Sequence, residues 1–441
     1  MRLQWPNNSK STAALRICRS LADAGHRALL AGGCVRDLLI QHVPQDYDIA
    51  TSALPGEVAA IFPRTVGVGA SFGVQKVLDP DGEFEVATFR KDGPYHDGRH
   101  PSRVEFTDEA HDAQRRDFTI NALFYDPLAE KVLDYVDGRR DIELKVIRTV
   151  GDPEQRFAED YLRLIRAVRF AARLEYRIDA KTMSAICHLA PNILKVSVER
   201  IRDELLKILT EGHPKRGFEL LDETGLLARV LPEVAQMKGV PQPPEYHPEG
   251  DVFAHTLLVL EHLDNPTATV ALAALLHDVG KPLTITFEDR IRFNSHDSVG
   301  ADVAYKICKR LHLSRAEMER VVWIVKQHMR LAVARDMKES KLKRFIREPG
   351  LEELIEVGRA DAMGSHGNAA HIDWIENYAA NMAPEAVHPP PLLTGNDLIE
   401  LGYAPGPLFG GILRAVEDAQ LENRLQNKEE ARRYVVENWP A

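Results

Sequence analysis

The sequence predicts an α+β protein: a head with a small mixed sheet, followed by an all-helical neck, middle domain and tail. Short apolar runs bounded by Gly, Pro and Asp alternate with amphipathic segments over roughly the first 150 residues. Beyond Pro153 the apolar residues keep helical spacing almost to the last residue. A chain of 441 residues is also too long for one ordinary core, which indicates two to four domains.

The head is expected to open with an amphipathic helix over residues 11–25, beginning at Ser11 or Thr12. The apolar run 28–31 then meets Gly32 and Gly33, which indicates a strand, a glycine turn and a helix from Val35 to Ile40. Two hairpins complete the predicted sheet, with strands at 74–78, 84–89, 122–125 and 131–135.

Proline-rich segments divide the helical remainder. Residues 241–248 hold four prolines and predict a linker, and residues 384–391 separate the last helices. We therefore expect a head at 1–148, a neck at 149–240, a middle domain at 241–383 and a tail at 384–441.

Composition limits the class of protein. Hydrophobic residues make up 44% and charged residues 28%, which is typical of soluble globular proteins. The longest apolar run, 270–276, is too short to cross a bilayer, and the four cysteines are scattered singly. We expect a reduced cytoplasmic setting and no membrane partner. The net charge of −10 argues mildly against nucleic acid, although a local row of arginines can still bind phosphates.

Two aspartates of the head point to metal chemistry. If residues 46–49 are extended, Asp46 and Asp48 project to the same side of a strand, about 7 Å apart. Such a pair can share divalent ions that assist phosphoryl transfer, and Arg36 in the preceding turn segment could bind a phosphate. A lone Asp-x-Asp is common in surface turns, so the prediction depends on its combination with the glycine turn.

The segment Gly32–Asp37 followed by Asp46-Tyr47-Asp48 resembles the signature of the DNA polymerase β-type nucleotidyltransferase superfamily. More narrowly, it resembles the class II (bacterial-type) CCA-adding enzymes and their poly(A) polymerase relatives. The resemblance implies a polymerase β-like head in which Asp46 and Asp48 hold Mg²⁺ while Gly33 and Arg36 contact the nucleotide. Glu85 is either a third catalytic acidic group or a charge on an exposed strand face.

Two further blocks match the same family. In residues 115–123 the resemblance places Arg116 against the nucleotide, with Asp117 and Asn121 as supports. In residues 159–173, four arginines spaced by three or four fall on one side of a predicted helix. By itself that pattern also fits a solvated basic stripe. The resemblance assigns base reading to Asp160 and Arg163 and nucleotide support to Arg166 and Arg169.

The segment 90–101, rich in Gly, Pro and Asp, predicts a loop of low order. It resembles the flexible loop that family members use when they switch from adding C to adding A. Relatives that add only CC are shortened here, and this chain shows no evident shortening, which favours A addition as well.

The middle domain carries His255, then His277-Asp278 at the end of a highly apolar helix, then Asp361. This order, with Gly-Lys-Pro following, resembles the HD-domain phosphohydrolase superfamily. The resemblance makes these four residues ligands of Mg²⁺ or a divalent transition metal. It places His296 and His328 where some members bind a second ion, and Lys281 could neutralise a phosphate.

The expected function is addition of C, C and A to tRNA 3′ ends from CTP and ATP, with phosphoester hydrolysis by the HD domain. The alternatives are a poly(A) polymerase, an enzyme adding only CC or only A, and chiefly an HD phosphohydrolase of nucleotides or cyclic phosphates. A catalytically silent RNA-binding protein is a further alternative. The tail, 393–407, resembles the end of HD-bearing members and is expected to support RNA or structure.

Overall fold

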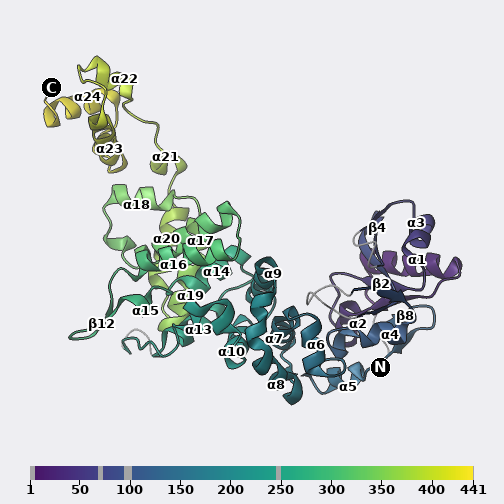
Figure 1. The fold of residues 1–441 in the computed structure, drawn as a ribbon. Coiled ribbons are helices and arrows are strands. Elements are labelled where there is room, and N and C mark those ends of the chain that lie inside the picture. The colour runs from purple at the N-terminus through teal and green to yellow at the C-terminus, as the bar shows by residue number, and fades with distance from the viewer. Residues whose placement is uncertain (1–4, 68–72, 94–101, 245–249, 441) are drawn as a thin grey trace. The chain divides into compact units, whose positions relative to one another are not determined.

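The computed structural model describes residues 5–67, 73–93, 102–244 and 250–440. Its chain divides into two compact units, Met1–Pro232 and Glu233–Ala441, and each is described by itself (Figure 1). The first unit contains the strands of the head and the helices of the neck. The second unit is mostly helical.

The head is built on a seven-stranded mixed sheet in the order β3-β4-β5-β2-β1-β8-β9. Neighbouring strands run antiparallel except β2 and β5, which are parallel. Two short pairs, β6 with β7 and β10 with β11, stand outside it. The strands are β1 Ala28–Ala31, β2 Asp48–Thr51, β3 Thr65–Gly67, β4 Val74–Asp79, β5 Gly82–Thr88, β6 Arg90–Asp92, β7 Val104–Phe106, β8 Phe124–Asp126, β9 Lys131–Leu133, β10 Val146–Ile147 and β11 Arg177–Ile178.

The predicted N-terminal helix is confirmed as α1, which spans Ser9–Asp23. It begins earlier than the sequence suggested because the Asn8 side chain accepts a hydrogen bond from the Ser11 backbone N–H and caps it. Its apolar face is buried in the same core cluster as Ile49 of β2 and Val86 of β5. A second core cluster contains Ala31 of β1 and Ala50 of β2 together with Phe124 of β8.

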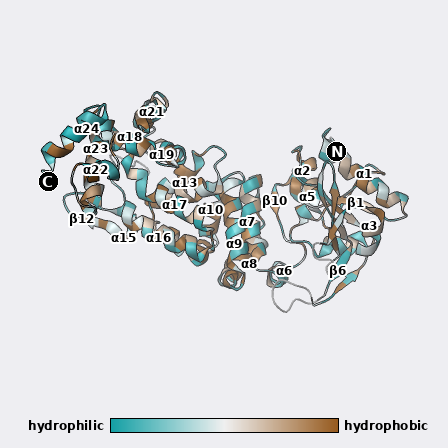
Figure 2. Ribbon diagram, turned by 90° about the horizontal axis from the view of Figure 1, so that it is seen from above, coloured by the Kyte–Doolittle hydropathy of each residue, from teal (hydrophilic) through white to brown (hydrophobic). Residues whose placement is uncertain are grey.

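Amphipathic helices form the neck, and in Figure 2 they show brown apolar and teal polar residues in alternation. The longest, α7 and α9, bury their apolar residues and, in addition, one charged residue each, Arg169 and Glu204. The helices of the first unit after α1 are α2 Gly33–Leu39, α3 Pro55–Ile61, α4 Glu109–Gln114, α5 Gly138–Glu143, α6 Pro153–Glu159, α7 Leu162–Leu174, α8 Ala180–Leu189, α9 Val198–Thr210, α10 Pro214–Glu223 and α11 Leu227–Val230. The 3₁₀ helices are Thr119–Asn121 and Ala190–Lys195.

The second unit centres on α14, whose residues from Val270 to Leu276 are all buried. At the tail, Lys343 of α18 donates a hydrogen bond to the carbonyl of Leu421 at the end of α23. The later helices of the chain are α12 Pro232–Ala235, α13 Val252–Glu261, α14 Ala268–Leu276, α15 Lys281–Thr284, α16 His296–Arg310, α17 Arg315–Gln327, α18 Glu339–Ile346, α19 Leu351–Ser365, α20 Ala370–Ala380, α21 Pro384–Val387, α22 Gly395–Glu400, α23 Pro407–Leu421 and α24 Lys428–Asn438, with 3₁₀ turns at His328–Arg330 and Ala334–Asp336.

The expectation of an all-helical remainder needs correction. The neck contains β11, which pairs with β10, and the second unit contains the hairpin of β12 (Ile285–Phe287) and β13 (Ile291–Phe293). These strands have two or three residues, too short for the period-two pattern to stand out.

Smaller differences concern boundaries and loops. The strand expected at 122–125 begins at Phe124, because the preceding residues form a 3₁₀ turn. The loop expected from residue 90 begins with the short strand β6, while residues 94–101 lie outside the described residues. The linker expected at 241–248 falls partly at 245–249, which also lie outside them. Among the residues described, no helix combines the length and apolar character that a bilayer crossing requires.

Gly138, the first residue of α5, lies against the backbone of Thr119. A Cβ atom at Gly138 would stand 2.2 Å from the Thr119 carbonyl oxygen, and a backbone atom cannot move aside cheaply. We predict that Gly138→Ala lowers the free energy of unfolding of the first unit by about 1–3 kcal/mol, as overpacking does.

The matched control is Gly56→Ala in α3, where an added Cβ meets nothing within 4 Å. This variant should be neutral or more stable, because alanine suits a helix better than glycine. Scanning calorimetry of both proteins checks the prediction, and equal melting temperatures would contradict it.

Candidate functional site

The first candidate site is a cavity of roughly 700 Å³ inside the first unit, between the sheet and the neck helices. It gathers sequence-predicted residues from four separate segments, so distant parts of the chain meet there. Glu85 does not line it. The predicted lining residues are Gly33, Arg36, Asp46, Asp48, Arg116, Asp160, Arg163, Arg166 and Arg169.

Asp46 and Asp48 lie at the sheet end of the cavity, and Glu85 is their neighbour in the sheet. Asp48 begins β2, and the parallel register that pairs Ile49 with Val86 places Glu85 beside it on β5. Asp46 lies two residues before the strand; its side chain is 81% exposed and pairs with Lys10 at 3.2 Å. In the described part of the chain, the head brings no three potential ligand atoms within 4.8 Å of one another.

The electrostatics of Asp48 favour a cation. Desolvation by the surrounding protein, with the nearby carboxylates of Glu85 and Asp46, raises the pKa of Asp48 to about 6, although Arg116 opposes the shift. A divalent ion between the carboxylates would relieve that repulsion. The donor set therefore fits a hard cation such as Mg²⁺, provided that Asp46 turns from Lys10 toward Asp48.

Gly32 makes the turn into α2 possible. Its φ of 73° is in the left-handed region, and a Cβ there would stand 2.8 Å from Nη1 of Arg116. Arg116 in turn donates to the carbonyl of Asn121 and lies over the ring of Phe124, 4.9 Å from its centroid. Glycine at position 32 thus lets this arginine lie at the cavity wall.

Arg36 is placed differently from the sequence expectation of a phosphate ligand. Its side chain is only 3% exposed. Its Nε and Nη2 donate to Asp37, its Nη1 donates to Asn121 at 2.6 Å, and its guanidinium lies over the ring of Phe170 in α7. These contacts tie the α2 segment to α7, so Arg36 supports the cavity wall.

Asp117 connects this cluster with the arginines of α7. Its Oδ1 accepts from Asn121, and its Oδ2 accepts from Arg166 at 2.6 and 2.9 Å. Burial opposes ionisation of Asp117, but the Arg166 guanidinium outweighs it and lowers the pKa of Asp117 to about 2. Asp117 is therefore a charged anchor at neutral pH.

Helix α9 supplies acidic partners for the same arginines. Glu204 accepts from Arg169 at 2.7 Å, and Glu211, just beyond the helix, accepts from Arg169 at 3.0 Å. The Arg169 side chain is only 7% exposed. The alternative of a solvated basic stripe is therefore wrong, since these arginines line the cavity and are ordered by carboxylates.

The two residues expected to read the base both line the cavity. The Arg163 backbone N–H donates to the Asp160 carbonyl at 3.1 Å, but their side chains have different partners. Arg163 donates to the Glu159 carboxylate and to the backbone carbonyl of Arg156. Asp160 instead forms a two-bond pair with Arg200 of α9.

Sequence reasoning missed the contribution of α9 to the cavity. Arg200, Lys207 and Glu211 all line it. Their spacing, together with Glu204, follows one helix face and was the available signal.

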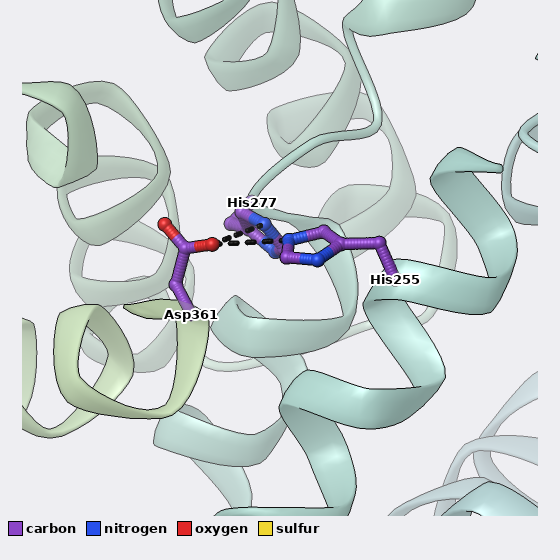
Figure 3. Close-up of side chains that lie close together, drawn as sticks. All are labelled: His255, His277 and Asp361. Carbon is purple, nitrogen blue, oxygen red and sulfur yellow. Dashed lines mark ion pairs between the residues drawn. The ribbon is translucent and has the colours of Figure 1, made fainter. Parts of the chain in front are cut away.

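The second candidate site lies in the second unit, where His255 of α13, His277 at the end of α14 and Asp361 of α19 converge (Figure 3). Nε2 of His255 lies 3.0 Å from Oδ1 of Asp361, and Nε2 of His277 lies 3.9 Å from the same atom. Asp278 completes the set, with its Oδ2 3.1 Å from Nε2 of His277.

A second group shares Asp278. Oδ1 of Asp278 lies 3.5 Å from Nε2 of His296 and 3.9 Å from Nε2 of His328, and the two imidazole nitrogens are 3.2 Å apart. Asp278 therefore faces both groups, one with each oxygen. All four predicted HD ligands and both additional histidines are brought together here.

Backbone contacts orient these imidazoles. The Nδ1 atoms of His277, His296 and His328 each lie 2.6–2.8 Å from a carbonyl three residues earlier in the chain. An Nδ1–H donated to that carbonyl leaves the Nε2 lone pair directed at the cluster, the usual arrangement of metal-bound histidine. Ligands about 2.1 Å from one ion stand about 3.0–3.4 Å apart. The separations here are 3.0–3.9 Å, so each group would hold a cation after a small inward shift of its side chains.

A cavity of roughly 750 Å³ opens over this cluster. Lys281 lies in it with Nζ 2.6 Å from Oδ2 of Asp278 and 2.6 Å from Oε1 of Gln242. Arg290 and Arg292 of the β12–β13 hairpin also line the cavity. A metal cluster beside basic groups can receive a phosphoester.

Comparison with known proteins gives matches along most of the chain. The model described as the poly A polymerase head domain matches residues 28–148. The model described as the probable RNA and SrmB-binding site of polymerase A matches residues 175–238, and the HD domain model matches residues 252–363.

Among curated proteins, the chain is 44% identical over 211 residues to the CCA-adding enzyme of Limosilactobacillus reuteri, covering 48% of this chain and 52% of that protein. It is 42% identical over 232 residues to the CCA-adding enzyme of Anoxybacillus flavithermus, covering 52% and 58%. The matched stretch thus spans about half the length of these relatives.

Among solved structures, the Bacillus stearothermophilus CCA-adding enzyme in complex with CTP superposes with a TM-score of 0.73 at 27% identity. The superposition covers 97% of this chain and 96% of that one. The similarity of fold therefore extends over both units, well beyond the aligned stretch of the curated relatives.

The shared position of Asp278 generates a prediction about metal stoichiometry. In an Asp48→Asn background, which weakens the head site, the protein should bind about two Co²⁺ ions per chain, since each group offers three ligands. Asp278→Asn should abolish the binding of both Co²⁺ ions, whereas His328→Ala should abolish the binding of one. Calorimetric titration measures the counts.

The control is His262→Ala at the exposed end of α13, which should keep both ions. Full binding by Asp278→Asn would contradict the shared-ligand arrangement.

Proposed function

Because the chain belongs to the class II family of CCA-adding enzymes and poly(A) polymerases and carries an HD domain, we propose that it adds C, C and A to tRNA 3′ ends from CTP and ATP. One observation carries the proposal: a single cavity joins the carboxylates Asp46 and Asp48 to Asp160 and Arg163. The relatives' names and the CTP bound by the superposed enzyme support the same activity.

In this proposal residues 1–148 form the nucleotidyltransferase head and residues 149–240 the base-reading neck. Residues 241–383 form the HD domain and residues 384–441 the tail. The family-model matches at 28–148, 175–238 and 252–363 support this division.

At the sheet end of the cavity, Asp46 and Asp48 would hold Mg²⁺, and Glu85 would add negative charge beside Asp48. Bound there, the ion supplies charge that favours attack of the RNA 3′ hydroxyl on the α-phosphate and departure of pyrophosphate. Gly33 lies at the turn, and because glycine has no side chain, the nucleotide can approach the backbone closely there. Arg116, Arg166 and Arg169 give the cavity the positive charge that a triphosphate needs.

At the neck end, the pair of Asp160 and Arg163 accounts for the choice of base. Cytosine and adenine both present an amino group beside a ring-nitrogen acceptor, so one carboxylate and one guanidinium can serve both. Uracil and guanine present a carbonyl oxygen where the amino group stands, and a carboxylate repels it.

The HD domain provides a second proposed activity, hydrolysis of a phosphoester. Its two ligand groups would bind Mg²⁺ or a divalent transition metal, and the bound ions would activate water. Lys281, Arg290 and Arg292 would neutralise the phosphate in the adjoining cavity. The site of this domain is separate from the head carboxylates in sequence and in ligand chemistry.

The central test is incorporation into tRNA that lacks its CCA end, with labelled CTP alone, ATP alone, and both. We expect two C additions followed by one A. Asp46→Asn should reduce the rate by at least about a hundredfold, since metal stabilisation of the transferred phosphoryl group is worth several kcal/mol.

The control variant is Asp81→Asn, on the turn between β4 and β5, which should retain full activity. A long A tail would instead identify a poly(A) polymerase, and addition of only CC or only A a partial enzyme. If no nucleotide is incorporated while phosphate is still released, the HD domain would carry the activity and the head would not.

The two sites should be separable. Asp48→Asn should abolish incorporation and leave hydrolysis of 2′,3′-cyclic AMP or p-nitrophenyl phosphate unchanged, while Asp278→Asn should do the reverse. Each assay on each purified variant checks this. Loss of both activities in either variant, with an unchanged melting temperature, would show that the two sites are coupled.

A further inference from the structure

We infer that Arg200 is a positioning residue for base selection, which holds the Asp160 carboxylate in the orientation that accepts the amino group of cytosine or adenine. The inference rests on the proposed function and adds to it a residue of α9, outside the segment 159–173 that carries Asp160 and Arg163. Arg200 and Asp160 are 40 positions apart in the chain and line the same cavity.

The contact between the two side chains is a forked pair. Nη1 of Arg200 donates to Oδ1 of Asp160 at 3.2 Å, and Nη2 donates to Oδ2 at 2.6 Å. The backbone N–H of Leu162 also donates to Oδ1, at 3.1 Å. Two donors of one planar group and one backbone donor fix the plane of the carboxylate. The remaining acceptor sites of the carboxylate are left for a ligand.

Asp160 needs such a restraint because no helix holds it. It follows α6 with an extended backbone, φ −155° and ψ 104°, and precedes α7 by one residue. Its side chain is 16% exposed and that of Arg200 is 25% exposed, so the pair lies at the cavity surface and remains in contact with solvent. An unrestrained carboxylate there would rotate among several positive groups.

A possible competitor for Asp160 is Arg163, its proposed partner in base reading. In the structure Arg163 is held by Glu159 and by the carbonyl of Arg156, while Asp160 is held by Arg200. Each member of the reading pair therefore has a separate restraint. Were they to pair with each other, their hydrogen-bonding edges would face one another, and neither would meet the base.

The test compares Arg200→Met and Arg200→Lys with the wild type and with Arg202→Met. Arg202, two residues along α9, pairs with Asp203 and does not line the cavity. Arg200→Met should raise the KM for CTP and ATP about tenfold, the effect of losing one hydrogen-bonded charge, with kcat changed by less than about twofold. Its preference for CTP over UTP should fall by a similar factor.

Arg200→Lys should recover part of both effects, since lysine keeps the charge but not the fork. Arg202→Met should match the wild type in KM and in base preference. A merely structural role of Arg200 would lower the melting temperature and leave the CTP-to-UTP preference unchanged, and that result would overturn the inference. A lower KM in Arg200→Met would overturn it too, because Arg200 would then compete with the base.

Equilibrium binding of CTP and UTP in the absence of RNA separates this inference from the proposed function. If the wild type adds no nucleotide to tRNA, the proposed function fails. The ratio of the two dissociation constants still tests Arg200: a ratio equal in the wild type and Arg200→Met refutes the inference, and a reduced ratio in the variant supports it.

Discussion

A continuous set of arginine–carboxylate contacts determines the shape of the head cavity. It runs from Asp37 through Arg36 and Asn121 to Asp117, and continues along α7 to the acidic residues of α9. Arginines crowded at one wall would repel each other and fold outward into solvent without these partners. Because each guanidinium is held, the cavity presents ordered positive charge to a polyanion. The contacts also join α2 of the head to α7 and α9 of the neck, so the same residues determine the shape and the charge of the cavity.

The HD cluster follows the same rule with different chemistry. Imidazoles replace guanidinium groups, and backbone carbonyls fix their tautomers and orientations. Burial opposes charge on Asp278, yet His277 and Lys281 hold its pKa well below the usual range, so the carboxylate is ionised. In the head, polar groups that would be unfavourable singly become stable as a mutually satisfied set.

Sequence reasoning located the strands around the glycine turn, the carboxylates and the HD ligands, because local patterns and short spacings carry those signals. It did not find Arg200, since the partner of Asp160 depends on how α9 packs beside α7. It predicted a phosphate contact for Arg36, which lines the cavity, but not that Asp37 and Phe170 would hold its guanidinium. Pairing between distant helices is a property of packing, which periodicity along one segment does not contain.

Helix α7 carries both Arg163, which is proposed to read the base, and the later arginines, which are proposed to face the phosphates. From Arg163 to Arg173 the axis advances about 15 Å at 1.5 Å per residue, on the scale of an extended nucleoside triphosphate. In the proposed function, this helix sets the distance between the residue that reads the base and the arginines that face the phosphates. Inserting a single residue between Arg163 and Arg166 would turn every later side chain of the helix by about 100°. The later arginines would then no longer face the same side as Arg163. Evolution can therefore exchange side chains along this segment far more readily than it can change its length.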